Sequence, residues 1–231
     1  MVRREQLALS LLVGTFIGAA AGYLGHLMVS KRMALVGGAL GHMTILGITL
    51  GFLYGIDISI TSLIVLLIGI FLIWLFELRS GLPTEALTGV VFASSVAIGF
   101  LFLPRPGIEL AVLGDITRIG FWDGLVAIAI SVLIIAVHHK MLCPKLTLAD
   151  VSEELAKSVG VEVEKYHLLY LACIALLVAF CVKIVGALLT AAIVVIPASA
   201  ARNFSKNFRQ YCRLGALIGA ITLIAGIIAY A

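Results

Sequence analysis

A single histidine stands among glycines in the middle of an apolar stretch that is long enough to cross a bilayer. The stretch reads VGGALGHM over residues 36–43, and it contains Gly38, Gly41 and His42. Ionisable side chains are costly in hydrocarbon, and within membrane spans they commonly mark a substrate or ion pathway. Glycines in close succession weaken a helix, and broken backbone at that depth is tolerated where it lines a cavity. We therefore expect His42 to lie on a pathway through the membrane.

The composition places the chain among multi-pass membrane proteins. Of its 231 residues 62% are hydrophobic and 12% are charged, whereas a soluble domain is about half apolar and about a quarter charged. The net charge of +4 gives no indication of nucleic-acid binding, because in a membrane protein the placement of Lys and Arg matters more than their sum. We expect one transmembrane domain over residues 1–231.

Hydropathy predicts an all-α bundle of about eight transmembrane helices. Each predicted span is long enough, or nearly so, to cross about 30 Å of hydrocarbon. The weakest boundary lies near Lys183 and Gly186. The predicted spans are 6–28, 33–55, 58–78, 85–103, 120–138, 166–182, 184–201 and 213–230.

The distribution of basic residues predicts the orientation of the bundle. If the first, third, fifth and seventh loops face the cytoplasm, 11 of the 16 Lys and Arg residues lie on that side and five on the other. Cytoplasmic loops of membrane proteins carry the excess of positive charge. We therefore expect this orientation in the cytoplasmic membrane, with Arg3 and Arg4 as a local exception.

Glycines at four-residue spacing predict close helix packing. Gly14, Gly18 and Gly22 repeat this spacing in the first span, and Gly215 and Gly219 repeat it in the last. Small residues let helices in lipid approach each other closely. We therefore interpret these glycines as packing contacts.

The remaining histidines and the cysteines are interpreted as structural. Cysteines without CxxC spacing are usually small buried hydrophobes. We expect His26 at the membrane interface and His138 and His139 at a helix C-terminus, which favours cationic groups. The four cysteines, expected to form neither a disulfide nor a metal framework, are Cys143, Cys173, Cys181 and Cys212.

The long loop after the fifth span, about residues 144–165, contains the sequence of a short amphipathic helix. Asp150 or Ser152 can cap its N-terminus, and Gly160 can end it. Val151, Leu155 and Val159 recur at four-residue spacing along one side. Such a helix could lie on the membrane surface or insert into a cytosolic partner.

Four segments give the chain a resemblance to a known family. EELAKSVGV at 153–161 resembles the coupling loop of type II ABC importer permeases, and RMALVGGALGH at 32–42 resembles a signature of the manganese, zinc and iron permeases. EALTGVVFASS at 85–95 resembles a further segment of that family, as do VGALL at 185–189 and IPASAAR at 196–202 taken together. The segments occur in the family's order, which is what makes the resemblance specific.

The resemblance implies a permease subunit that forms a homodimer in the cytoplasmic membrane of a prokaryote. It further implies two partners: a cytosolic ATP-binding subunit and an extracellular solute-binding protein that delivers a divalent metal such as zinc, manganese or iron. The chain has no G-x-x-x-x-G-K-[ST] phosphate loop and no intrinsic cofactor is expected, so ATP would be used by the partner. The residues that correspond to the coupling loop are Glu153, Glu154, Leu155, Ala156, Val159, Gly160 and Val161.

The chain departs from the family pattern at the proposed pathway. The metal pathway of the family carries an Asp and a His four residues apart, and the resemblance implies that the histidine, retained here as His42, can contact the metal. This chain has Gly38 in place of the Asp and Gly41 in place of a Ser. Glu85 or Asp57 could supply the missing carboxylate. The cargo could instead be a softer metal or a chelated metal or cobalamin-type complex, or the chain could be a divergent paralogue.

Two other classes of protein fit the sequence less well. An intramembrane hydrolase would need a HExxH motif, paired intramembrane aspartates or a matched nucleophile, and none of these is evident. A passive channel has no use for a loop helix that docks an ATPase. The family usually continues past residue 231, so we expect that a final C-terminal segment could be missing here.

Overall fold

The chain folds into a bundle of membrane-length helices, as hydropathy predicted. The computed structural model describes residues 4–31, 33–103, 114 and 120–230. Eight stretches within these residues are long and apolar enough to span a membrane. The helices are α1 (Arg4–Ser30), α2 (Ala34–Tyr54), α3 (Ile58–Ser80), α4 (Thr84–Phe102), α6 (Phe121–Val137), α7 (Cys143–Val151), α8 (Glu153–Ser158), α9 (Val163–Phe204) and α10 (Phe208–Tyr230).

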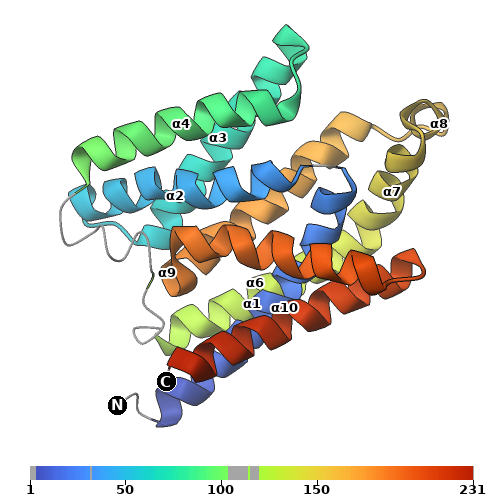
Figure 1. Cartoon of the computed structure of the whole chain (residues 1–231). Helices are drawn as coiled ribbons and strands as arrows, with labels where there is room; N and C mark the ends of the chain where they lie inside the picture. The colour runs from blue at the N-terminus through green and yellow to red at the C-terminus, as the bar shows by residue number, and fades with distance from the viewer. Residues whose placement is uncertain (1–3, 32, 104–113, 115–119, 231) are drawn as a thin grey trace.

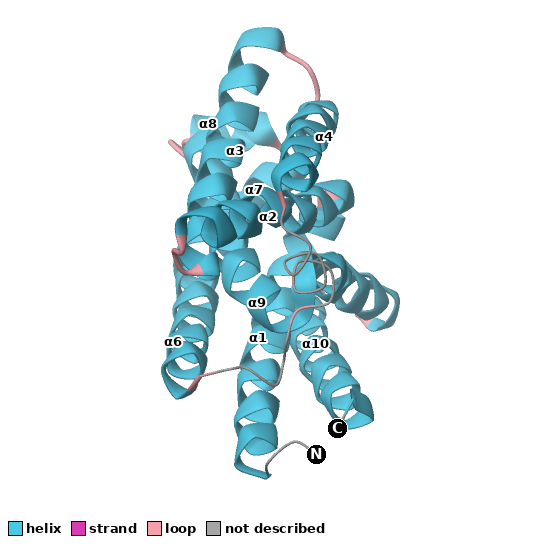
Figure 2. Cartoon of the chain, turned by 90° about the vertical axis from the view of Figure 1, so that its left-hand side faces the viewer, coloured by secondary structure: helices cyan, strands magenta, loops and turns pink. Residues whose placement is uncertain are grey.

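Helix α1 occupies the centre of one half of the bundle. It packs against α10, α9 and α6, while α2, α3 and α4 form a second group that joins the first mainly through α2 and α9 (Figure 1). The α3–α4 hairpin projects from the bundle (Figure 2). A buried hydrogen bond from the Tyr170 hydroxyl to the Leu24 carbonyl, 2.7 Å long, ties α9 to α1.

The glycines of α1 and α10 bring the two backbones into direct contact. A Cβ atom added at Gly18 would lie 2.4 Å from the carbonyl oxygen of Gly219, and one added at Gly22 would lie 2.0 Å from that of Gly215. Real Cβ atoms do not approach backbone so closely. The predicted packing role of these glycines is therefore confirmed.

The sixth and seventh spans form one helical run that reverses at a glycine. Gly186 has φ 81° and ψ 166°, a conformation open to glycine but strained for other residues. The two halves of α9 run back alongside each other (Figure 1), which returns both of its ends to one end of the bundle. The weak boundary predicted near Lys183 and Gly186 is thus a sharp reversal at Gly186.

The predicted long loop at 139–165 is mostly helical, which corrects the sequence expectation. A π-helical turn, His138–Leu142, continues α6 directly into α7, so the helical run extends from Phe121 to Val151. The loop was expected because charged and polar residues begin at His138. Apolar residues such as Leu142 and Leu146 remain buried beyond that point and keep the chain helical.

The first, third, fifth and seventh loops lie at one end of the bundle, which we call the α8 end. Lys31 after α1, Glu85 after α3 and Asp150 on α7 line one cavity. Phe208, which starts α10, places its ring 5.1 Å from that of His26 on α1. The count of Lys and Arg residues assumed that these four loops share one side, and the structure places them at one end.

We predict that Gly22→Ala destabilises the protein, because the new methyl group must displace the backbone of α10. Overpacking of this kind costs about 1–3 kcal/mol or more, so the midpoint of thermal unfolding in detergent should fall by several degrees. Gly226→Ala on α10 is the matched control, since no atom lies within 4 Å of its Cβ position. Equal midpoints for both variants would contradict the proposed backbone contact.

Candidate functional site

Helix α8 forms because its N-terminus is capped and its first turn is acidic. The Ser152 hydroxyl accepts a hydrogen bond from the Leu155 backbone N–H at 3.2 Å, so Ser152 rather than Asp150 is the cap of this helix. Glu153 and Glu154 stand in the first turn, where the helix dipole favours negative charge. Lys157 pairs with Glu153 at 2.7 Å, one turn apart.

Gly160 ends the helix, as the sequence predicted. Its backbone has φ 81°, in the left-handed region, and its N–H donates to the Lys157 carbonyl at 3.0 Å. The Val161 N–H donates to the Ala156 carbonyl, also at 3.0 Å. These two bonds satisfy carbonyls that a helix end otherwise leaves unpaired.

One small residue anchors α8 while its larger apolar residues face outward. Ala156 is fully buried, whereas the exposed fractions of Leu155 and Val159 are 50% and 63%. Val151 is also exposed, but it belongs to α7, because Ser152 with φ −158° and ψ 115° breaks the helix. The expectation of one helix carrying Val151, Leu155 and Val159 is therefore corrected, although all three side chains are available for contact with a partner.

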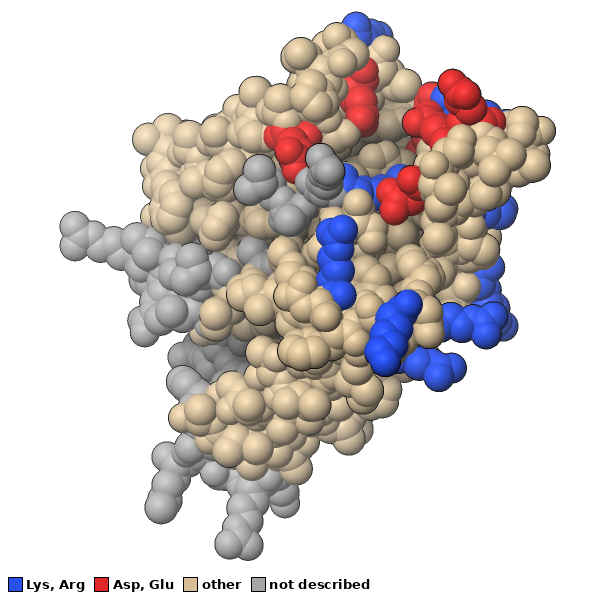
Figure 3. All heavy atoms as spheres, turned by 45° about the vertical axis from the view of Figure 1, so that its right-hand side comes forward, with Lys and Arg blue, Asp and Glu red and all other residues tan. Residues whose placement is uncertain are grey.

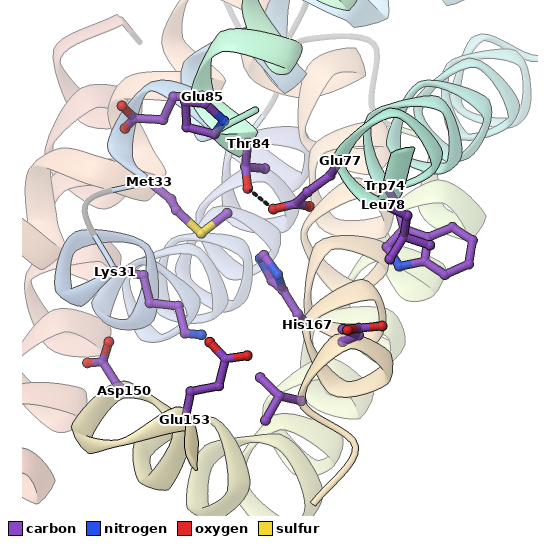
Figure 4. A pocket seen from close by; sticks show the side chains of 13 residues that line it. Lys31, Met33, Trp74, Glu77, Leu78, Thr84, Glu85, Asp150, Glu153 and His167 are labelled. Atoms are coloured by element: carbon purple, nitrogen blue, oxygen red, sulfur yellow. Dashed lines mark hydrogen bonds between the residues drawn. The ribbon is translucent and has the colours of Figure 1, made fainter. Parts of the chain in front are cut away.

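A cavity of about 730 Å³ separates α8 from the α3–α4 hairpin (Figure 4). Acidic side chains from three parts of the chain line it, and the Thr84 hydroxyl donates a hydrogen bond to Glu77 within it. Of these acids, Glu85, Asp150 and Glu153 could be singled out from the sequence. Glu77 and Glu164 could not, because they come from helices that are distant in sequence. The acidic lining comprises Glu77, Glu85, Asp150, Glu153 and Glu164.

Lys31 is the basic residue that lies among these acids. Burial lowers its pKa, while the neighbouring carboxylates of Asp150 and Glu153 oppose that shift. The hydrogen bond and the charge of Lys157 lower the pKa of Glu153. Acidic and basic side chains occupy adjoining parts of this face (Figure 3). The α8 end thus holds opposite charges around a water-accessible hollow.

His42 lies half-buried on α2, and its ring centroid is 5.8 Å from that of Phe92 on α4. Helix α2 is unbroken from Ala34 to Tyr54. The expectation that Gly38 and Gly41 break the backbone is therefore wrong, because the helix hydrogen bonds continue through them. His42 is eight residues from the start of α2, a depth of about 12 Å along the axis.

The structure does not bring Asp57 and Glu85 together. Asp57 caps α3, accepting a hydrogen bond from the Ser59 N–H at 2.8 Å, while Glu85 stands in the first turn of α4. Both are exposed, and the length of α3, about 34 Å, separates the two ends. Among the described residues, no set of three His, Cys, Asp or Glu ligand atoms gathers at His42.

Comparisons with known proteins give one consistent family. A family model described as "ABC 3 transport family" matches residues 3–231. The high-affinity zinc uptake system membrane protein ZnuB of Haemophilus influenzae is 28% identical over 225 residues, covering 95% of this chain and 85% of the relative. The manganese import system permease protein ScaB of Streptococcus parasanguinis is 26% identical over 222 residues, covering 94% and 79%.

A solved structure has the same fold. PsaBC from Streptococcus pneumoniae in complex with Fab superposes with a TM-score of 0.85 at 23% identity, covering 99% of this chain and 84% of that chain.

We predict that Gly160→Ala loosens the end of α8. The Ala side chain is strained at φ 81°, and the cost should be about 1 kcal/mol. Hydrogen exchange of residues 155–161 should rise about fivefold. Gly160→Asn is the control, since Asn tolerates the left-handed conformation best after Gly. Unchanged exchange in the Ala variant would mean that Gly160 does not hold this end of the helix.

Proposed function

This chain belongs to the ABC 3 transport family, and from that premise we propose that it is the membrane-spanning permease subunit of an ATP-driven importer. The cargo that we propose is a divalent metal ion of the zinc, manganese and iron group. The names of the relatives ZnuB and ScaB, which specify zinc uptake and manganese import, support this cargo. Localisation in the cytoplasmic membrane of a prokaryote is part of the same proposal.

The structure of α8 is the observation that supports this proposal most directly. A short capped helix is fixed by buried Ala156 and presents Leu155 and Val159 outward at the end where four loops meet. Exposed apolar side chains that gather on a rigid support are typical of a docking surface. We assign this surface to the cytosolic ATP-binding subunit. The sequence has no phosphate-binding loop of its own, so the proposal places ATP hydrolysis on that separate polypeptide.

Helix α8 is linked to the spans through α7 and α9, against which it packs. The acidic cavity lies between α8 and the α3–α4 hairpin (Figure 4). Movement of α8 on a closing ATPase would therefore act on the bundle through α7 and α9, and α9 packs in turn against α2 and α3. Rigid-body displacement of packed helices is a common route to a change of access.

For the pathway we propose His42 as the metal-contacting residue within the bilayer. Its half-buried position between α2 and α4 supports this role, with Gly38 and Gly41 on the same helix. Asp57 and Glu85 lie at opposite ends of α3, which suits successive positions near the two mouths better than one shared site with His42. The extracellular solute-binding protein would deliver the cargo at the Asp57 end.

A chelated cargo is the second candidate. Within the described residues His42 belongs to no group of three His, Cys, Asp or Glu ligand atoms that would form a site for a bare ion. A metal held by its own chelator would need fewer protein ligands. The uptake experiment below separates these two cargoes.

We further propose that the subunit pairs with a second copy through α4. Gly89, Ala93 and Ala97 recur at four-residue spacing and are exposed on that helix, and no atom lies within 4 Å of the Cβ position at Gly89. Small residues at this spacing are typical of helix contacts in lipid. Lipid would surround the remaining apolar surface.

We predict that Leu155→Ala weakens the docking of the ATPase subunit. Loss of a central apolar contact typically costs 1–2 kcal/mol, so the affinity measured in detergent should fall about tenfold. Leu155→Met is the control and should bind normally because it keeps the apolar volume. Native affinity in the Ala variant would contradict the assignment of this surface.

We predict that His42→Ala reduces uptake by about tenfold or more while the complex still assembles, because the ion loses its ligand at mid-membrane. Uptake of labelled Zn²⁺, Mn²⁺ and Fe²⁺ by vesicles that contain both subunits is the measurement, with chelated forms tested in parallel. Thr49→Ser, a change outside the proposed pathway on the same helix, is the control. Unchanged uptake kinetics would assign His42 a structural role, and transport of chelates alone would exclude the free ion as cargo.

A further inference from the structure

A histidine and two cysteines from three separate helices meet inside the α8 end of the bundle. His26 stands near the end of α1, Cys143 begins α7, and Cys212 lies in the first turns of α10. The imidazole nitrogen and the two sulfur atoms lie within 4.8 Å of one another. None of the three was expected to take part in a site, because the cysteines are far apart in sequence.

His26 is held in the form that a metal ligand requires. Its Nδ1–H donates a hydrogen bond to the Tyr23 carbonyl, so in the neutral ring Nε2 carries the lone pair. Such a bond from the other ring nitrogen is typical of metal-ligating histidines. His26 is fully buried, and Nε2 has no hydrogen-bond partner. A buried, unpaired nitrogen costs free energy, and a bound cation would remove that cost.

Four rings pack around His26, which is buried, as is Cys212, whereas Cys143 is half-buried. Edge-on ring contacts surround His26, with centroid distances of 5.5 Å to Tyr23, 5.2 Å to His138, 5.1 Å to Phe208 and 5.8 Å to Tyr211. His138 is itself fully buried, and neither of its ring nitrogens has a partner. His26, expected at the membrane interface, is enclosed within the protein by rings from α1, from the π-helical turn His138–Leu142 and from α10.

The π-helical turn before Cys143 helps to explain how the cysteine reaches this group. One additional residue per turn rotates the following side chains by about 100° relative to a regular α-helix. The Cys143 N–H accordingly donates to the His138 carbonyl, five residues back. Insertions of this kind are frequent at functional sites.

We propose that His26, Cys143 and Cys212 form a binding site for a thiophilic cation of the Zn²⁺ class. Two thiolates and one imidazole suit Zn²⁺ and disfavour Mn²⁺, Mg²⁺ and Ca²⁺. Ligand atoms in a tetrahedral zinc site are about 3.5–3.8 Å apart, so side-chain movements of about 1 Å would complete the geometry. His138 is the buried neighbour from which a fourth ligand could come.

A cation at this site would fasten α1, α7 and α10 to one another. Because α7 leads through Ser152 directly into α8, occupancy would stiffen the support of the docking helix. The binding of the cation itself does not depend on the proposed transport function. The same ligands could hold either a permanently bound ion or a cargo ion in transit. If the ion remains bound through purification without added metal, it is permanently bound.

The test is metal binding by the full chain in lipid nanodiscs after chelator treatment and reduction. The native chain should bind one more Zn²⁺ than the double variant Cys143→Ser/Cys212→Ser. Any Zn²⁺ that the double variant still binds at this position should be held at least about 100-fold more weakly than in the native chain. Loading with Co²⁺ should give sulfur-to-cobalt charge-transfer absorption in the native chain and none in the double variant. Mn²⁺ should not displace the ion.

Cys181→Ser is the matched control, since Cys181 is a buried cysteine in α9 that does not belong to the group. It should keep the native stoichiometry. Equal Zn²⁺ binding by the native chain and the double variant would overturn the proposal, and so would isolation of Cys143 and Cys212 as a disulfide. If the double variant fails to fold, the Co²⁺ spectrum of the native chain decides: absence of the thiolate band refutes the site.

Discussion

The contact between the backbones of α1 and α10 is the constraint on which the rest of this structure depends. Helices in lipid gain little from burying apolar surface against each other, so close approach through small residues must hold them together. Gly18 and Gly22 meet Gly219 and Gly215 with no space for a side chain. This contact fixes the end of α1 beside the start of α10, and with them the positions of His26, Lys31 and Cys212.

That arrangement gathers the functional groups at the α8 end. The fixed end of α1 supplies Lys31 to the acidic cavity and His26 to the cysteines, while α7 reaches the same region from α6. Helix α8 lies on this support through Ala156 and leaves its larger apolar residues exposed. The proposed pathway at His42 lies apart from it, along α2. A force applied at α8 would therefore act on the pathway through the ends of the helices.

Sequence alone predicted the spans and the local ends of α8, because hydropathy, capping and glycine punctuation are local properties. Ser152 could be recognised as a helix cap, and Gly160 as a helix end, from their residue types alone. Burial of His26 and its meeting with Cys143 and Cys212 could not be predicted, since three distant helices create that environment. The continuation of α6 through His138–Leu142 was also missed, because polar residues resembled the end of a span. Asp57 and Glu85 looked interchangeable by sequence, yet α3 holds them at opposite ends.

The account depends most on the α8 end facing the cytosol. The direct measurement is labelling of single-cysteine additions with a membrane-impermeant maleimide in oriented vesicles, corrected for the native chain. Ser158→Cys on α8 and Ile56→Cys in the loop between α2 and α3 are exposed positions at opposite ends. The account predicts labelling of Ser158→Cys only in inside-out vesicles and of Ile56→Cys only in right-side-out vesicles. The reverse pattern would contradict it.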